Sequence, residues 1–346
     1  MKFTVTAGFS LLALCTLGYS MSAPVAPQRL EVVRQPITVN GKTKEVYNIV
    51  QPNGFWGYTG IEGQSFNVIV KNNTNVPTVI HWHGLLVPNS QDGVPGVTQA
   101  PILPGHSMHY EFPLIQSGTY WMHSHEGLQS QDLMAAPLII WNPHSRYPKD
   151  QQVVMLLEDF TFQSPDEILK KLQTSAGSMP TSHNHTQMIM NMGSANAKPD
   201  LNDVSYDAFL TNRRTLQHPE VIRVKPDTWV RLRVIDGAAG SNFWISTGKL
   251  QSEAIAFDGH NIQPLTESSY QIAMGQRIDI RVFIPKSGGA FPILGLVEGT
   301  PHQTGLILAT KDATIPTLPQ TTESAVPALN NQQEEAMKST DPLAPK

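Results

Sequence analysis

Two histidine pairs of the form His-x-His constrain this sequence more than any other feature. They are His81-Trp82-His83 and His123-Ser124-His125, and each follows β-branched, aromatic or apolar residues that favour a β-strand. Successive side chains of a strand point to opposite faces, so the two histidines of a pair emerge on the same side. Neutral imidazole binds copper, zinc, iron and nickel, and four converging rings would form a strong site for such a metal.

An alternative interpretation applies to each histidine taken alone. A single histidine in a strand is more often a core or surface residue with ordinary hydrogen-bond partners than a metal ligand. Here two pairs occur, with His83 and His123 separated by 40 residues and a glycine directly after the first pair. This arrangement favours a metal site over four unrelated histidines.

Three segments around these pairs resemble one protein family. Residues 81–88 (HWHGLLVP), 91–96 (QDGVPG) and 117–125 (SGTYWMHSH) are similar to the amino-terminal half of the multicopper oxidases. This family includes laccases and bacterial copper-resistance oxidases, and the resemblance covers almost the whole chain after residue 23. It implies a trinuclear copper centre that reduces dioxygen to water, with electrons delivered by a separate blue copper.

The resemblance also implies roles for single residues. His81 corresponds to the family's ligand of the type 2 copper, and His83, His123 and His125 correspond to ligands of the type 3 pair. Asp92 corresponds to an acidic residue that hydrogen-bonds water near the type 2 copper and relays protons in catalysis. A simple turn explains Asp92 equally well, because a glycine follows it.

Composition restricts the fold and the classes of partner. Of the 346 residues, 40% are hydrophobic and 15% are charged, which is typical of a globular chain with an ample core. The 27 prolines and 25 glycines indicate many turns between short strands, so the sequence predicts an all-β fold. A net charge of -4 indicates no basic patch, and we expect no nucleic-acid partner.

The first 23 residues resemble a secretory signal. Lys2 precedes an apolar run at 9–17, and Ser22 and Ala23 are small residues suited to a cleavage site. Residues 1–23 are therefore predicted to be a signal peptide, and we expect a secreted, periplasmic protein without a membrane span. The only cysteine, Cys15, lies inside this segment. Because a blue copper site needs a thiolate, the predicted mature chain cannot form one.

The remaining chain divides into two predicted domains and a tail. Residues 24–145 and 146–311 contain short segments of alternating polarity and are interpreted as two cupredoxin-like Greek-key β-sandwich domains in tandem. The second corresponds to the family's middle domain. In its segment 229–234, arginines alternate with aliphatic residues, which predicts one solvated and one buried face. Residues 312–346 lack aromatic residues and have few aliphatic ones, which predicts a linker or disordered tail.

A methionine-rich segment in the second domain is a weaker candidate for copper contact. Its methionines and histidines lie among polar residues and glycine, and they are Met179, His183, His185, Met188, Met190 and Met192. Thioether sulfur selects Cu(I), so these side chains suit a copper-handling loop. The alternative is a flexible loop whose methionines are incidental or serve in packing.

Three functional hypotheses follow from the absence of a third-domain motif in this sequence. In the first, the chain is a truncated or split multicopper oxidase, inactive alone, that holds half of the trinuclear site and works with a separately encoded third domain. In the second, it is an exported protein that sequesters copper without turnover. In the third, the scaffold serves protein contact only, although the presence of all four histidines argues against this. The linker-like end of the chain favours the first hypothesis over the second.

Overall fold

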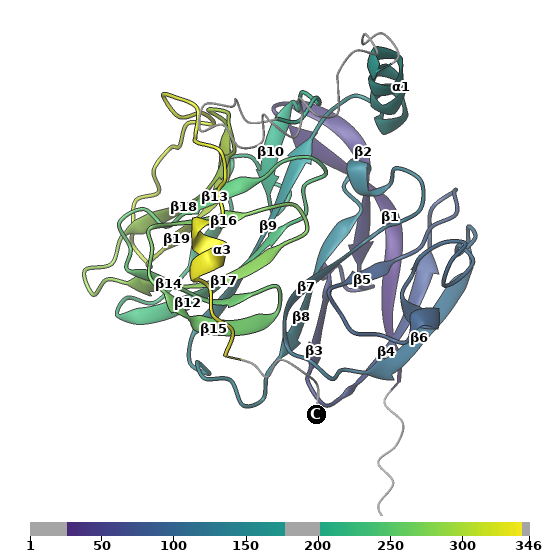
Figure 1. Cartoon of the computed structure of the whole chain (residues 1–346), viewed down its shortest axis with the longest axis horizontal. Helices are drawn as coiled ribbons and strands as arrows, with labels where there is room; N and C mark the ends of the chain where they lie inside the picture. Colours follow the sequence, from purple (N-terminus) through teal and green to yellow (C-terminus); the bar gives the residue numbers. More distant parts are fainter. Residues whose placement is uncertain (1–25, 177–200, 341–346) are drawn as a thin grey trace, which may run out of the picture.

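Two β-sandwiches lie side by side in the computed structural model, which describes residues 26–176 and 201–340 (Figure 1). The predicted signal peptide and the methionine-rich segment 179–192 lie outside the described residues. Almost all regular structure is β-strand, so the predicted all-β class is confirmed. Within the described residues, two helices accompany the strands, α1 (Pro165–Ala176) and α3 (Gln332–Ala336). Neither helix of the described ranges has the length and apolar character needed to cross a bilayer.

The first sandwich consists of two four-stranded sheets. One has the order β2-β1-β4-β6, with β1 (Gln28–Val39), β2 (Lys42–Val50), β4 (Ser65–Asn72) and β6 (Ser107–Pro113). The other has the order β3-β8-β7-β5, with β3 (Tyr58–Ile61), β5 (His81–His83), β7 (Gly118–His123) and β8 (Ala135–Trp141). Short 3-10 turns at Asn89–Gln91 and Ser130–Asp132 interrupt the connecting loops.

The second sandwich has a six-stranded and a five-stranded sheet. The six-stranded sheet has the order β10-β9-β12-β17-β14-β15, with β9 (Gln151–Phe160), β10 (Ala208–Thr211), β12 (Thr228–Asp236), β14 (Ser252–Phe257), β15 (His260–Leu265) and β17 (Arg277–Ile284). The five-stranded sheet has the order β11-β19-β18-β13-β16, with β11 (Val221–Arg223), β13 (Phe243–Ser246), β16 (Ser269–Ile272), β18 (Ala290–Val297) and β19 (Gln303–Ala309).

Buried and exposed residues alternate along the strands, and the buried ones form the core of each sandwich. In β4, Phe66, Val68 and Val70 are fully buried while the residues between them are partly exposed, as a strand covered on one face requires. Phe66 packs between Trp82 and Phe112, with ring centroids 4.7 and 4.6 Å away. These aromatic contacts fix β5, the strand of the first histidine pair, against the core of the first sandwich.

The prediction that one face of β12 is exposed to solvent is wrong. Arg231 and Arg233 alternate with Leu232 and Val234 as expected, but both arginines are buried. The reason is tertiary: β7 of the first sandwich covers this face, and Thr119 of β7 accepts a hydrogen bond from Arg233 Nη1 at 2.8 Å. A face that the sequence marks as polar is here an interface between the two sandwiches.

Residues 312–346 were predicted to be a linker or a disordered tail, and the structure shows an ordered segment over 312–340. These residues lie along the second sandwich and hydrogen-bond to its backbone: Thr322 N donates to Pro301 O at 2.7 Å and Thr340 N to Asn261 O at 2.9 Å. Trp244 Nε1 in turn donates to Pro327 O at 3.0 Å. Composition alone predicted too little apolar burial for order, but backbone hydrogen bonds to a preformed sheet hold this segment.

Candidate metal centre

Strand β5 places two of the predicted ligands on one face of the first sandwich. Trp82, between them, is fully buried in the core, and its Nε1 donates to a backbone carbonyl at 3.0 Å. Since alternate residues of a strand face opposite sides, His81 and His83 turn away from that core. β5 pairs antiparallel with β7, in a register that sets His81 opposite His123 and His83 opposite Trp121.

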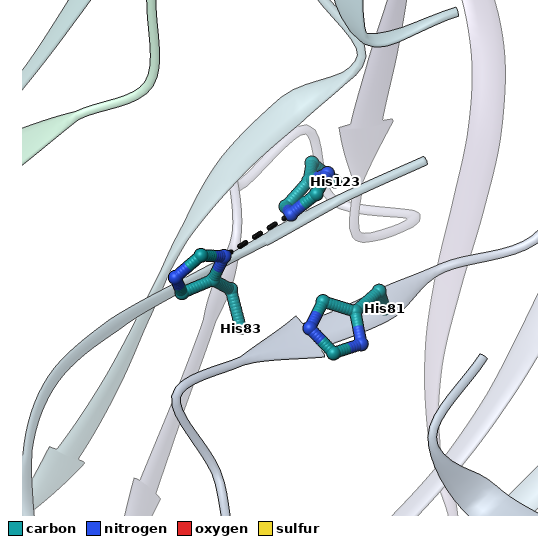
Figure 2. A group of neighbouring side chains, drawn as sticks. All are labelled: His81, His83 and His123. Carbon is teal, nitrogen blue, oxygen red and sulfur yellow. Dashed lines mark hydrogen bonds between the residues drawn. The ribbon is translucent and has the colours of Figure 1, made fainter. Parts of the chain in front are cut away.

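The structure brings all four predicted histidine ligands together. One ring nitrogen from each of His81, His83 and His123 lies within 4.8 Å of the other two (Figure 2). Nδ1 of His83 and Nε2 of His123 are 3.2 Å apart. His125 follows the end of β7, and its ring centroid lies 4.5 Å from that of His81 and 4.8 Å from that of His123. We call these four residues the histidine cluster.

Backbone carbonyls determine which nitrogen carries the proton in two of the rings. Nδ1 of His81 lies 2.8 Å from the carbonyl oxygen of Asp92, and Nδ1 of His123 lies 3.2 Å from that of Ser124. A ring that donates from Nδ1 keeps a lone pair on Nε2, where a metal can bind. The Asp92 carboxylate is close as well, with Oδ1 3.3 Å from Nδ1 of His81. Asp92 thus contacts this predicted ligand through both backbone and side chain.

Gly93 allows the chain to approach β5 closely beside Asp92. Its φ of +73° lies in the left-handed region that favours glycine, and a Cβ atom there would overlap the carbonyl group of Ile80. The glycine that suggested a simple turn in the sequence therefore also holds Asp92 next to His81.

Burial keeps three of the rings neutral. It is the main cause that lowers the pKa of His83 to about 3 and that of His123 to about 3, and the other rings of the cluster act in the same direction. Arg277 contributes further to the low pKa of His83. Burial also lowers the pKa of His125. At pH 7 these rings are free of the proton that would compete with a metal ion for the lone pair.

The sequence matches a known family over most of its length. A profile of the family described as multicopper oxidase matches residues 32–145, and a second profile of the same description matches residues 151–311. The chain belongs to the multicopper oxidase family. This family membership implies copper as the metal and an oxidoreductase as the functional class.

Two relatives show how much of a multicopper oxidase this chain represents. It is 32% identical over 256 residues to copper resistance protein A of Escherichia coli and 31% identical over 242 residues to multicopper oxidase MmcO of Mycobacterium tuberculosis. These matches cover 67% and 68% of this chain but 41% and 47% of the two relatives. The chain therefore spans less than half the length of either relative.

A solved multicopper oxidase structure has the same architecture. The laccase from Botrytis aclada superposes with a TM-score of 0.66 at 26% sequence identity, over 88% of this chain and 56% of the laccase. The prediction of two cupredoxin-like sandwiches is thereby confirmed.

The histidine cluster fits the copper that this family implies. Imidazole nitrogens bind zinc at about 2.0–2.1 Å, a fair guide to copper, so two nitrogens on one such ion lie at most about 4.2 Å apart. The nitrogens of His81, His83 and His123 lie within 4.8 Å of one another, a spacing that is compatible with ligands of one ion or of neighbouring ions. The cluster can therefore hold one ion, or more than one, with at most a small ring movement.

Trp121 is a site residue that was not predicted from the sequence. Its ring stacks on those of His83 and His123, with centroids 4.9 and 4.2 Å apart, and its other contacts include Leu156 and Ile235 of the second sandwich. It thus positions two predicted ligands against the neighbouring domain. The sequence spacing could have identified it, because Trp121 and His123 are two residues apart in one strand and therefore share a face.

The second sandwich also contributes two residues that local sequence could not reveal. Gly275, with φ +79°, passes so close to His83 that a Cβ atom would lie 3.2 Å from its Cε1. Arg277 donates from Nη1 to the Gly275 carbonyl oxygen at 2.8 Å and lies 3.0 Å from Asp258. Nearly 200 residues separate these positions from His83 in the sequence, and only the docking of the two domains brings them together.

Proposed function

We propose that this chain is the copper-binding part of a multicopper-oxidase-type oxidoreductase and holds half of a trinuclear copper site. In this proposal His81 binds the type 2 copper, and His83, His123 and His125 bind the type 3 pair. The observation that carries it is the convergence of four imidazoles on one face, with two Nδ1 atoms occupied by backbone carbonyls and nitrogen lone pairs left for metal.

We further propose that another polypeptide segment completes the site, as a separately encoded third domain would. Exposed apolar side chains near the histidine cluster support this: Leu86 is 66% exposed, Ile115 60% and Met274 48%. Leu86 and Ile115 lie close together, because Leu86 N donates at 2.6 Å to the side-chain oxygen of Gln116, the residue after Ile115. Exposed apolar residues beside a polar site are typical of a protein contact.

The segment that completes the site would also supply the type 1 copper. The only cysteine in this sequence is Cys15, which lies in the proposed signal peptide, and a blue copper site needs a thiolate ligand. We therefore infer that residues 24–346 form no type 1 site by themselves and that residues 1–23 direct export to the periplasm. Alone, the chain would bind copper and turn over no substrate.

Within the assembled site, copper would supply the electron transfer to dioxygen. The residues of this chain hold and orient the ligand rings: the Asp92 carbonyl fixes His81, and Trp121 stacks on His83 and His123. The Asp92 side chain is 31% exposed, so water can reach it. We propose that Asp92 accepts and releases protons through such water beside His81.

Copper titration of the purified metal-free chain tests this function. We expect copper binding at fewer sites than a complete family member has, no intense blue absorption, and negligible oxidation of phenols or Cu(I). Replacement of all four cluster histidines by glutamine abolishes this binding. The matched control, His106→Gln with His109→Gln, changes two exposed histidines outside the cluster and leaves it intact. An intense blue band, or copper binding that survives the fourfold replacement, contradicts the proposal.

Sequestration without turnover is the alternative, and a second measurement separates it from the split oxidase. A third domain from a complete relative is mixed with the copper-loaded chain, and dioxygen consumption is measured. Restored consumption that falls at least about tenfold in Asp92→Asn supports the oxidase and the proton role of Asp92. Tight copper binding with no consumption in any mixture supports sequestration.

A further inference from the structure

A cleft between the two sandwiches concentrates positive charge that the proposed function does not use. It encloses about 390 Å³ beside β12, β14 and the segment 142–147, which joins the two sandwiches. Small-molecule sites typically measure about 300–1,000 Å³. Among the described residues that line it, none has a carboxylate, and the basic side chains are Arg146, Arg231, Arg233 and His144.

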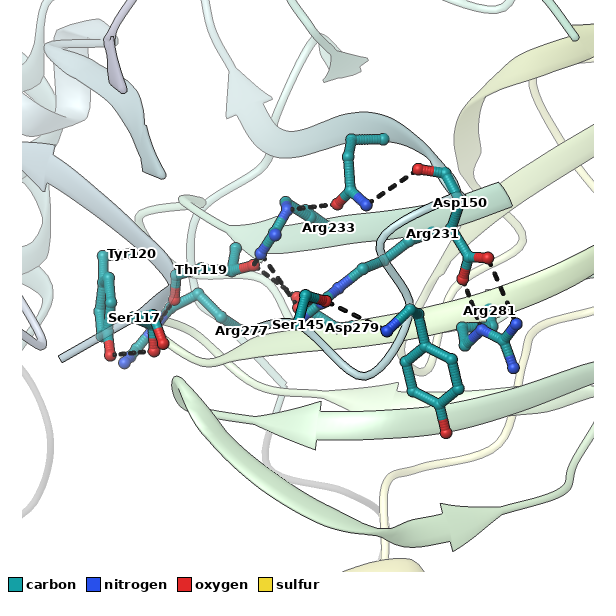
Figure 3. A network of polar contacts seen from close by, with 12 residues as sticks. Ser117, Thr119, Tyr120, Ser145, Asp150, Arg231, Arg233, Arg277, Asp279 and Arg281 are labelled. Carbon is teal, nitrogen blue, oxygen red and sulfur yellow. Dashed lines mark hydrogen bonds and ion pairs between the residues drawn. The ribbon is translucent and has the colours of Figure 1, made fainter. Parts of the chain in front are cut away.

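Two of these arginines are held rigidly in place. Arg231 and Arg233 are two residues apart in β12 and so extend from the same face. Both donate to one carboxylate oxygen of Asp279 on β17, Arg231 from Nε at 2.9 Å and Arg233 from Nη1 at 3.2 Å (Figure 3). Arg233 also donates from Nε to Gln152 at 2.9 Å and from Nη1 to Thr119 at 2.8 Å. Fixed donors of this kind need no reorganisation to receive a ligand.

One carboxylate cannot neutralise two guanidinium groups. Other acids near this wall are already paired: Asp150 and Glu253 each lie 2.5 Å from Arg281. Burial lowers the pKa of Arg233 to about 10 in spite of Asp279, which agrees with an incompletely compensated charge. The side wall of the cleft therefore has an excess of positive charge.

Unused hydrogen-bond donors accompany this charge. The side chains of Arg231 and Arg233 are only 10% and 3% exposed, yet Nη1 of Arg231 and Nη2 of Arg233 donate to no acceptor in the described part of the chain. Ser145, at the same cleft, accepts from the backbone N–H of Tyr147 at 3.2 Å, so its hydroxyl proton is available to donate. Neither arginine nitrogen is itself fully buried, so both are accessible from the cleft, where acceptor oxygens of a ligand could receive their hydrogen bonds.

We propose that this cleft binds the oxyanion group of a small molecule, a phosphate or a carboxylate. Such a group would balance the excess positive charge of Arg231 and Arg233, and its oxygens would accept hydrogen bonds from the donors that have no acceptor. Arg146, an exposed residue of the segment that joins the two sandwiches, adds a third guanidinium to the lining. A bound anion would connect β12 of the second sandwich to that segment and so stabilise the arrangement of the two domains.

Calorimetric titration of the full metal-free chain with sodium phosphate and, separately, sodium citrate tests this inference at constant ionic strength in chloride. We expect saturable binding of at least one of them. Arg231→Gln weakens it by about tenfold, because a charge-assisted hydrogen bond is lost, and Arg146→Gln weakens it by about threefold. The control Arg29→Gln, an exposed arginine in β1 outside the cleft, leaves the affinity within about twofold of wild type.

The outcomes separate the two sources of the anion and the failure of the proposal. Binding of phosphate alone identifies a tetrahedral oxyanion, and binding of citrate alone identifies a carboxylate; either supports the site. The absence of binding for both anions overturns it. Equal affinity in wild type, Arg231→Gln and Arg146→Gln also overturns it, because the anion is then adventitious. Arg146 makes no hydrogen bond in the described residues, so its variant stays informative if Arg231→Gln fails to fold.

Discussion

Two polar clusters lie along one face of β7 and differ in how their hydrogen-bonding groups are satisfied. Near the start of the strand, Thr119 donates to Asp279 and accepts from Arg233 at 2.8 Å, so charge-assisted hydrogen bonds join the first sandwich to the second. At its end, His123 lies among other imidazoles, and a hydrogen bond joins two ring nitrogens, His83 Nδ1 and His123 Nε2, at 3.2 Å.

This difference separates a structural cluster from a binding cluster on the same surface. Charge-assisted hydrogen bonds stabilise the metal-free chain, whereas imidazoles joined by one ring-to-ring hydrogen bond would exchange it for stronger metal bonds when an ion binds. Trp121 lies between the two on the same face of β7, is 6% exposed and belongs to one buried cluster with Leu156 and Ile235. Substitutions in the arginine–aspartate cluster should therefore change the stability of the metal-free chain, and substitutions in the histidine cluster should change its stabilisation by copper.

The largest expected effect is on folding, from Asp279→Ala. The substitution leaves Arg231 and Arg233 buried without a carboxylate, so we expect the free energy of unfolding to fall by about 3–5 kcal/mol. Urea denaturation in chloride buffer measures it, and Asp312→Ala, an exposed aspartate of the tail, serves as the control. A loss below about 1 kcal/mol would mean that solvent or anions already compensate the two arginines.

The second expected effect appears only with copper. Copper at 100 times its Kd should raise the free energy of unfolding of wild type by about 2.7 kcal/mol. In the double variant His83→Gln, His123→Gln this increase is lost, while the metal-free stability stays within about 1 kcal/mol of wild type. Thermal denaturation with and without copper measures both quantities. If the double variant loses stability equally in both conditions, the histidine cluster is structural and the comparison fails.

The sequence allowed the prediction of those parts of the fold and site that depend on local pattern. Alternation in 66–71 predicted a half-buried strand, which is β4, and the i and i+2 spacing of His81 and His83 predicted their common face. It also predicted that both histidine pairs would converge, which the register of β5 on β7 achieves. The strand and the common face follow from the two-residue period of a strand, whereas the convergence of the two pairs rests on the resemblance to the multicopper oxidases.

Features that depend on the docking of one domain on another were either not predicted or predicted wrongly. Alternation in β12 showed that Arg231 and Arg233 share a face, but not that β7 would cover it. The contact of Gly275 with His83 has no local signal in the sequence either. The tail at 312–340 was predicted from its own composition, although its order depends on backbone groups of the second sandwich. The alternation of polar and apolar residues identifies a polar face of a strand, but which element packs on that face depends on the whole fold.

Asp236, at the end of β12, tests whether a buried carboxylate needs a charged partner, because it is a buried acid without a cation beside it. Its Oδ1 accepts from Ala238 N at 3.0 Å, and its Oδ2 has no hydrogen-bond partner within the described ranges. Burial raises the pKa of Asp236 well above the ordinary value of 3.8. An unsatisfied buried charge is thus avoided by protonation, where Asp279 avoids it by pairing with arginine.

A third expected effect is a change in the pH dependence of stability, from Asp236→Asn. Above pH 3.8 and below its raised folded pKa, Asp236 is protonated in the folded chain and ionised in the unfolded one. Wild-type stability therefore falls as pH rises through this window, by up to about 1.4 kcal/mol per pH unit from this group. Asparagine needs no proton, so the variant lacks this contribution and becomes the more stable protein at the upper end of the window. Urea denaturation at pH 5, 6, 7 and 8 measures the difference, with the exposed Asp203→Asn as control. Parallel pH profiles for wild type and Asp236→Asn would show that Asp236 stays ionised, and that a lone buried carboxylate in this fold requires no partner.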